Sequence, residues 1–431
     1  MKLRLISALA ALAFAFPIYA ADGDEQQEKT NQFYIDAQIR PRGEYNNGYR
    51  NPRDKGDLPG WSINERARLT LGYARKNLEI KLGVQHVGIW GEDALTEKKG
   101  RVSMHEAWAK LITNNGRFFA IIGRQPLAYD GDRLISNLDW NVAGSWHDAV
   151  KLGYQDGKNT LHLLFAYNQN NDVTKGGYYD NTGAKPYKTM YAGWYHFTAP
   201  KFPLNVSLAL YSFGYECGTP EKGNTCYQQT FGTKVDYGYP QLNASLEAYY
   251  QFGHKVKDVT SSAFMVAING YYMPATWVNI GLGFDYLSGL NPNSKKNTAF
   301  DPLYGAHHKF YGNMDYFYAS TWNKWGLINP HLTGDFKLHP RSSLQVTYHY
   351  FAAAAKPSDF PGYEGVGRSL GSEIDLQFTY KVFKDITIQA GYSTMFGTKN
   401  MDALKGGNHK SWQDWAWVQI NINPRIFSIK W

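Results

Sequence analysis

The residues of this sequence that are best suited to bind a ligand are cations placed at alternate positions. Arg40 and Arg42 form one such pair, and Arg66 and Arg68 form another. A guanidinium group donates hydrogen bonds in a fork that matches a carboxylate, so several of them facing one space would attract anions. The full set of candidate cations is Arg40, Arg42, Arg66, Arg68, Lys110, Arg124, Arg133 and Lys151.

Carboxylates are interspersed among these cations, and the main ones are Glu44, Glu106, Asp130 and Asp148. One interpretation is a lining that replaces the hydration shell of an anionic solute. The other is an ion-pair network that only holds a wall together. Cations outnumber anions in the first strands, which favours the lining, and some residues would do both.

Arg124 stands at the end of an apolar, aromatic run, residues 117–122, that reads as a strand. Because a charge on such a strand cannot face lipid cheaply, we expect Arg124 to point into the enclosed space. Pro126 ends the pairing, and the loop after it, with Asp130, Asp132 and Arg133, is expected to fold over that space. The alternative is an arginine paired with a loop aspartate on an ordinary sheet.

Apolar and polar residues alternate through most of the chain. In residues 33–45 and 61–73 one face is apolar and ends in aromatic residues, while the other is polar and cationic. The same period of two recurs in many later segments, as far as residues 416–422. The sequence therefore predicts an all-β protein.

The segments between these strands alternate between short and long. The short ones are 74–77, 113–117, 155–159, 199–203, 238–241, 273–276, 339–342 and 381–385. The long ones are 46–60, 90–102, 125–145, 168–188, 214–227, 254–260, 288–325, 352–370 and 396–411. Eight turns and nine loops predict about 18 antiparallel strands in a membrane β-barrel, residues 32–431, with short periplasmic turns and long extracellular loops.

Composition supports a membrane barrel with its apolar face outward. Aromatic residues make up 16% of the chain, and several stand at strand ends, as in interface girdles. Mean hydropathy is −0.48, and no apolar run after residue 20 approaches the roughly 20 residues of a membrane helix. A helical membrane protein is thereby excluded.

The amino-terminal residues predict export. Residues 1–20 have a basic start, an apolar stretch and a cleavage site after Ala20, which is typical of a signal peptide. Residues 21–31 are polar and are expected to be disordered. We therefore expect the bacterial outer membrane and its lipid as the surroundings of the barrel. The net charge of +8 favours an anionic solute as partner, because nucleic acid is not expected for an exported protein.

Two further signals lie within the barrel sequence, one near its middle and one at its last residue. Cys217 and Cys226 lie close together, and in an oxidising compartment we expect a disulfide rather than a metal site. The chain ends at Trp431, and such a terminal aromatic residue resembles the signal read by the barrel-assembly machinery. Residues 427–431 form either a bulged end of the last strand or a short tail.

Several motifs resemble the alginate-export family of outer-membrane proteins. They are Gly123-Arg124-Gln125, Tyr129-Asp130 with Asp132-Arg133-Leu134, His147 to Leu152, Trp90 to Asp93, His105 to Trp108, and Gly312 to Tyr316. The resemblance implies a monomeric barrel of eighteen strands whose arginine-rich lumen passes a polyuronate. Its lining positions would match Arg66, Arg68, Arg124, Arg133 and Lys151, with Asp148 as an inward partner. The sequence departs from the family in Lys151, where arginine is usual, and in His147, where an aromatic residue is usual.

Other chemistries are weakly supported. His147 and Asp148 are neighbours on a strand and point to opposite faces, so this spacing gives no catalytic triad. His307 and His308 lack a third metal ligand at a familiar spacing, and a loop calcium site at Asp130, Asp132 and Asp139 is less favoured than a solvated loop. Loop aromatic residues would stack on sugars or serve in packing: Tyr178, Tyr179, Trp322 and Trp325.

We therefore expect no catalytic residues, no cofactor and no metal. The hypothesis is a passive channel for an anionic carbohydrate or carboxylate solute, most specifically a uronate-type poly- or oligosaccharide. The alternatives are a barrel enzyme acting on lipid or glycan, a general porin for small carboxylates, and an adhesin-like or structural barrel.

Overall fold

The computed structural model describes residues 31–93, 96, 101–172, 177–181, 186–320, 322 and 324–431. The predicted signal peptide, residues 1–20, and residues 21–30 of the segment expected to be disordered lie outside the described residues. Asn31, also assigned to that segment, is bonded through its backbone N–H and C=O to Trp431. None of the helices in the described part of the chain has the length and apolar character needed to cross a membrane.

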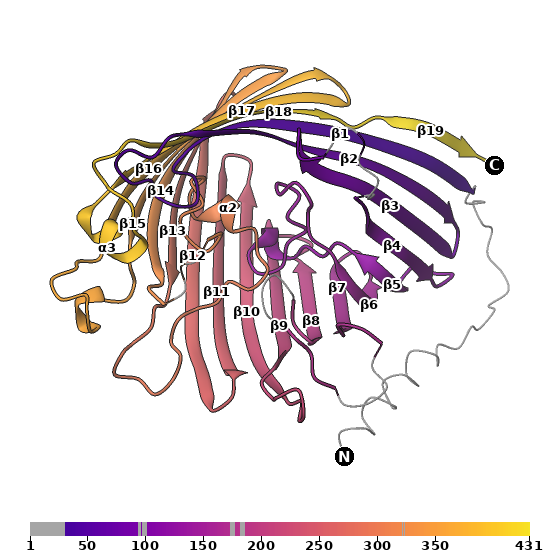
Figure 1. Cartoon of the computed structure of the whole chain (residues 1–431). Helices are drawn as coiled ribbons and strands as arrows, with labels where there is room; N and C mark the ends of the chain where they lie inside the picture. Colours follow the sequence, from indigo (N-terminus) through magenta and orange to yellow (C-terminus); the bar gives the residue numbers. More distant parts are fainter. Residues whose placement is uncertain are drawn as a thin grey trace.

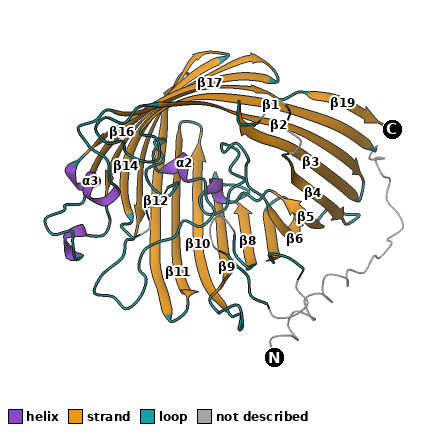
Figure 2. Cartoon of the chain, in the orientation of Figure 1, coloured by secondary structure: helices purple, strands orange, loops and turns teal. Residues whose placement is uncertain are grey.

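The chain forms one closed antiparallel sheet (Figures 1 and 2). Each strand pairs with the next in sequence, and β1 closes the ring by pairing with β18 and β19 as well as with β2. The strands are β1 (Gln32–Asn47), β2 (Gly60–Arg75), β3 (Leu78–Ile89), β4 (Val102–Ile112), β5 (Phe118–Gln125), β6 (His147–Gln155), β7 (Asn159–Tyr167), β8 (Thr189–Thr198), β9 (Leu204–Glu216), β10 (Thr225–Tyr239), β11 (Leu242–Val256), β12 (Val259–Ala275), β13 (Val278–Leu287), β14 (Leu327–His339), β15 (Ser342–Ala352), β16 (Ser369–Phe383), β17 (Ile386–Gly397), β18 (Gln413–Ile422) and β19 (Arg425–Lys430).

The last two strands are one strand with an interruption. β18 pairs with residues 39–47 of β1, and β19 continues along the same strand to Gln32. The break falls at Asn423-Pro424, where proline cannot donate a ladder hydrogen bond. The barrel therefore has eighteen strands, as predicted, and residues 427–431 are the end of the last strand rather than a tail.

All eight predicted short turns connect strands at one end of the barrel, and eight of the nine predicted loops are longer connections at the other end. The ninth prediction, a long loop at 254–260, is wrong. β11 continues to Val256 and β12 begins at Val259, so only Lys257 and Asp258 form the turn. The β-branched valines extend the pairing, and Asp258 accepts the positive φ of 62° that so tight a turn requires.

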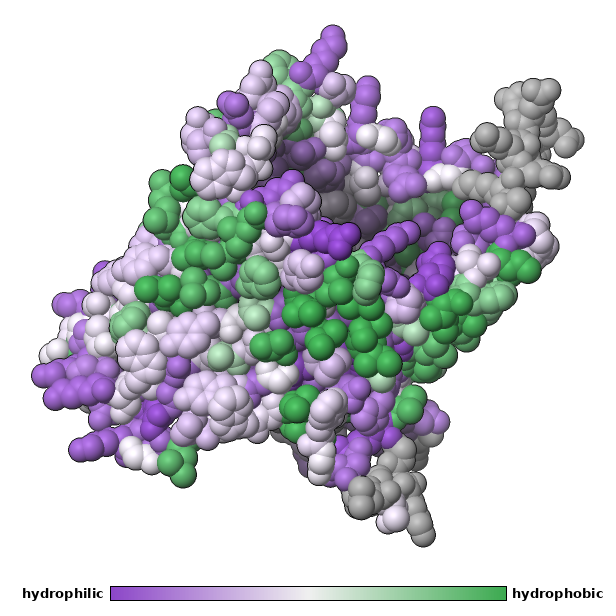
Figure 3. All heavy atoms as spheres, turned by 90° about the horizontal axis from the view of Figure 1, so that it is seen from above, coloured by the Kyte–Doolittle hydropathy of each residue, from purple (hydrophilic) through white to green (hydrophobic). Residues whose placement is uncertain are grey.

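The apolar face of the strands points outward and the polar face points into the barrel. Leu69 and Ile39 are 39% and 49% exposed on the outer wall, whereas Arg66, three residues before Leu69, and Arg40, next to Ile39, are buried inside. Figure 3, a view from above, shows apolar residues gathered on the outer wall. This orientation suits lipid outside and water inside, and it excludes a soluble barrel, which would have the opposite arrangement.

Two loops fold into the barrel and join there. The first is 126–146, between β5 and β6, and the second is 288–326, which carries α2 (His307–Phe310) (Figure 1). Ser136 N–H donates to the Tyr304 carbonyl at 3.1 Å, and Tyr304 N–H donates to the Leu134 carbonyl at 2.9 Å. The bridged segments, residues 132–136 and 304–306, are called the partition below, because they lie across the interior with Leu134 and Ile135 buried.

At the long-loop end, Cys217 and Cys226 form a disulfide between the end of β9 and the start of β10. The turn within it is also held by Glu216, whose carboxylate accepts hydrogen bonds from the backbone N–H groups of Gly218 and Asn224. The same carboxylate accepts from Lys188 Nζ at 2.7 Å. This rim of the barrel is therefore fixed by covalent and ionic contacts together.

Candidate functional site

Four arginines form a cluster on the inner wall of β1 and β2, defined here as Arg40, Arg42, Arg66 and Arg68. The strands place them together because Arg40 is directly opposite Arg66, and the other two occupy the next inward positions. Like charges facing each other across strands repel, so such a cluster needs compensating groups.

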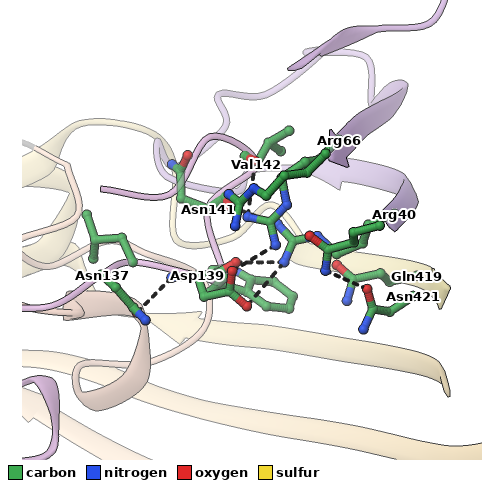
Figure 4. A network of polar contacts seen from close by, with 12 residues as sticks. Arg40, Arg66, Asn137, Asp139, Asn141, Val142, Gln419 and Asn421 are labelled. Carbon is green, nitrogen blue, oxygen red and sulfur yellow. Dashed lines mark hydrogen bonds and ion pairs between the residues drawn. The ribbon is translucent and has the colours of Figure 1, made fainter. Parts of the chain in front are cut away.

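Part of the compensation comes from the tip of the 126–146 loop (Figure 4). Arg66 Nη2 lies 2.8 Å from the Asp139 carboxylate, and Arg40 donates to the Asp139 carbonyl at 2.7 Å and to the Asn141 carbonyl at 2.9 Å. Desolvation by itself would raise the pKa of the Asp139 carboxyl, but Arg66 and Arg40 outweigh it and hold this pKa below its ordinary value. The arginine cluster therefore holds the loop tip, residues 137–143, against the wall.

The compensation is incomplete. Within ion-pair distance, the four guanidiniums meet only the carboxylates of Asp139 and Glu44, among the described residues, which leaves two positive charges. Arg68 is the clearest case, since it donates only to the Gln85 side-chain oxygen, at 2.7 and 3.0 Å. These cations therefore hold the loop tip, and the cluster keeps an excess of two positive charges over the carboxylates that it contacts.

Arg42 connects the cluster to aromatic groups. Its guanidinium lies 4.3 Å from the centre of the Trp140 ring, and the ring of His308 in α2 stacks on Trp140 at 4.7 Å. His308 Nδ1 in turn lies 2.7 Å from an Asp315 oxygen. The loop tip is thus also bound to the second inward loop.

Arg124 does not line the lumen, and this expectation is wrong. It lies in the same outward row as Ile122, which is 50% exposed, while Gln125 and Phe119 in the alternate row are buried inside. Its guanidinium pairs through two nitrogens with Asp148, both at 2.8 Å, and donates to the Met104 carbonyl. Asp148, expected to point inward, is likewise on the outer face. The pair is tolerated on the outer face because the two charges neutralise each other. Both residues also lie one position from the strand ends that lead into the long loop.

Arg133 and Asp130 lie inside the barrel, where they border a polar cavity. Arg133 is 1% exposed and lies 3.0 Å from Asp285 and 3.4 Å from Glu247, on the opposite wall. Burial by itself would lower the pKa of Arg133, but these two carboxylates raise it. Asp130 accepts hydrogen bonds from Trp194 at 3.0 Å and from Ser207 at 2.5 Å. Both residues therefore fix the partition to the strands.

Lys110, Lys151 and Glu106 project from the inner wall. Glu106 pairs with Lys81 at 3.1 Å and accepts from the Trp108 indole N–H at 2.8 Å. Lys110 lies 4.8 Å from the centre of the Phe119 ring. The wall of β3 to β6 thus continues the positive lining beyond the arginines.

A polar cavity of about 430 Å³ adjoins the partition, with Arg133 in its lining, and it was not predicted from the sequence. Asp285, His331, His349 and Asp375 line it from four neighbouring strands, with the two histidine rings 5.3 Å apart. Thr333, Thr347, Gln345 and Ser245 add hydroxyl and amide groups. The sequence pattern could have indicated these lining residues, because all of them occupy the polar positions of alternating strands.

The residues considered for a calcium site, a catalytic triad or sugar stacking do not form such sites. Asp130, Asp132 and Asp139 bind different partners, namely Trp194, Lys309 and Arg66, so they do not converge on one cation. His147 is buried with Nδ1 2.8 Å from the Tyr187 hydroxyl, on the face opposite Asp148. Packing, rather than open stacking, accounts for these loop aromatic residues: Tyr179, Trp322 and Trp325, all buried.

Eighteen strands, an apolar outer wall and a charged interior define a bacterial outer-membrane β-barrel of the porin type. The model of the alginate export family matches residues 75–397. The chain therefore belongs to this family, as the motifs of the sequence indicated. A comparison with curated protein sequences finds no match.

Solved structures agree on the fold. The crystal structure of Pseudomonas aeruginosa OccK1 (OpdK) superposes with a TM-score of 0.61 over 92% of this chain and 99% of that chain, at 10% identity. Acinetobacter baumannii OccAB1 gives a TM-score of 0.62 over 91% and 97%, at 11% identity. OpdK with vanillate gives 0.60 over 92% and 99%, at 11% identity. At this identity the likeness establishes the barrel fold.

Proposed function

We propose that this protein is a passive outer-membrane channel for anionic solutes, and that its solutes are uronate-type oligo- or polysaccharides. The observation that carries the proposal is the arginine cluster on β1 and β2, where four guanidiniums meet two carboxylates. Excess positive charge in a narrow lumen lowers the barrier for carboxylates and raises it for cations.

The polar cavity that adjoins the partition supports a saccharide as the solute. The cavity of about 430 Å³ is lined by amide, hydroxyl, imidazole and carboxylate groups, which match the hydroxyl groups of a sugar. A solute with carboxylates on one side and hydroxyl groups on the other would therefore suit both walls. Membership of the alginate export family supports the same class.

Reversal potentials in a salt gradient across a planar bilayer test the charge proposal. The parent channel should prefer chloride over potassium. Arg68→Gln removes one of the two uncompensated charges of the cluster, so it should move the reversal potential toward that of an unselective channel. The matched control is Arg124→Gln, which removes an arginine from the outer wall and should leave the reversal potential unchanged.

Equal effects of these two substitutions, or a parent channel that prefers cations, would contradict the proposal. Solute identity is tested separately by current block. Oligogalacturonates should interrupt the current at lower concentration than vanillate, which is the molecule bound to OpdK. Block by vanillate alone would favour the alternative of a general porin for small carboxylates.

A further inference from the structure

Trp108, Lys110 and Lys151 project from the inner wall close to one another. Trp108 and Lys110 are successive inward residues of β4, and Lys110 pairs with Ile121 of β5, which pairs with Lys151 of β6. The Cα atoms of the two lysines are therefore two strand spacings apart, about 10 Å. Long side chains at this separation can reach one small ligand.

The two ammonium groups lack sufficient carboxylate partners. Among the residues that the structure describes, Lys151 has no hydrogen bond and no ion pair, and Lys110 approaches Glu79 only to 3.8 Å. On the same wall Lys81 makes a tighter pair, at 3.1 Å from Glu106. Two half-buried amines that face one space repel each other, and an anion between them would relieve this repulsion.

Trp108 supplies a half-buried ring that is held in place and has no stacking partner. Its indole N–H donates to Glu106 Oε2 at 2.8 Å, which fixes the orientation of the ring. No aromatic ring or cation of the described chain stacks on it, and the residue opposite, Gly123, has no side chain to cover it. Trp140 differs, because Arg42 and His308 already contact its ring.

We infer that Trp108, Lys110 and Lys151 form a binding site for a carboxylate carried on a sugar ring, such as a single uronate unit. The inference rests on the proposed function, because the ligand must enter the lumen as an anion. The indole packs against the apolar face of the ring, and the two ammonium groups bind its carboxylate. Ammonium groups impose little orientation, which suits a solute that binds briefly and moves on.

Current block by D-galacturonate tests the site in the full-length channel. Lys151→Gln and Lys110→Gln should each weaken block about tenfold, the usual effect of losing one charge-assisted hydrogen bond. Trp108→Leu should weaken block by galacturonate but not by acetate, which has a carboxylate and no ring. Trp108→Tyr keeps an aromatic ring and should restore most of the affinity for galacturonate.

The matched control is Lys255→Gln, because Lys255 is an inward lysine already paired with Asp301. It should leave block unchanged. Block equal to that of the parent in the Lys110, Lys151 and Trp108 variants, beside normal anion preference, would overturn this site and leave the proposed function intact. A parent channel without anion preference would instead contradict the proposed function.

Discussion

An Arg133→Met variant should lose the partition. Arg133 is the cation between Glu247 and Asp285, and all three side chains are buried. Removing it deprives two neighbouring carboxylates of the cation that they share, and breaking a buried ion pair in this way typically costs about 3–5 kcal/mol. The closed ring of strands does not depend on Arg133, so we expect the inward loops to detach while the barrel persists.

Two measurements separate these effects. Limited proteolysis should cut the 126–146 loop in the variant and not in the parent, while the β-sheet circular dichroism signal of the two proteins stays the same. The triple variant Arg133→Met, Glu247→Gln, Asp285→Asn removes the unpaired charges together and should recover much of the protection. Equal protease resistance of parent and single variant would show that Arg133 does not hold the partition.

The strands were predictable from local patterning. Alternation of apolar and polar residues follows directly from the geometry of a strand, and a barrel in lipid needs that alternation along every strand. The interruption of the last strand at Asn423-Pro424 made its prediction ambiguous, because sequence alone does not show that β19 resumes pairing with β1. The loop predicted at 254–260 failed for a related reason, since valines on both sides continue the ladder.

The prediction that Arg124 points into the barrel was wrong for a physical reason. The cost of a charge that faces lipid predicted an inward Arg124, although its position in the alternation, two residues after Ile122, places it outside. In regularly paired strands, alternation decides whether a side chain points inward or outward. The free-energy cost of a charge on the outer face can be offset by a partner of opposite charge. Asp148 is that partner, directly opposite on β6. Near a strand end, alternation is therefore the better guide.

Contacts between the loops and the barrel wall could not be predicted from the sequence. Arg40 and Arg66 bind backbone carbonyl groups and one carboxylate that lie 73 to 101 residues further along the chain, namely at Asp139, Asn141 and Val142. Such contacts depend on how a long loop folds in three dimensions. The sequence did identify Arg40 and Arg66 as inward cations, and the structure adds what they hold.

Removal of the loop tip should enlarge the pore. Residues 137–143 reach from the β5–β6 side of the barrel to the inner wall of β1 and β2, where Arg40, Arg42 and Arg66 bind them. Replacing this tip by two glycines should give a several-fold larger single-channel conductance, because it opens the lumen beside the arginines. Anion preference should also rise, since the deletion removes the Asp139 carboxylate and leaves all four guanidiniums in place.

Asp139→Asn distinguishes the space that the tip occupies from the charge that it carries. This variant keeps the tip and its carbonyl contacts with Arg40, so its conductance should stay near that of the parent while anion preference rises. If the deletion left conductance unchanged, the open path would have to run elsewhere, on the cavity side of the partition. If instead Asp139→Asn alone matched the conductance of the deletion, the ion pair to Arg66 would be what keeps the tip in the lumen.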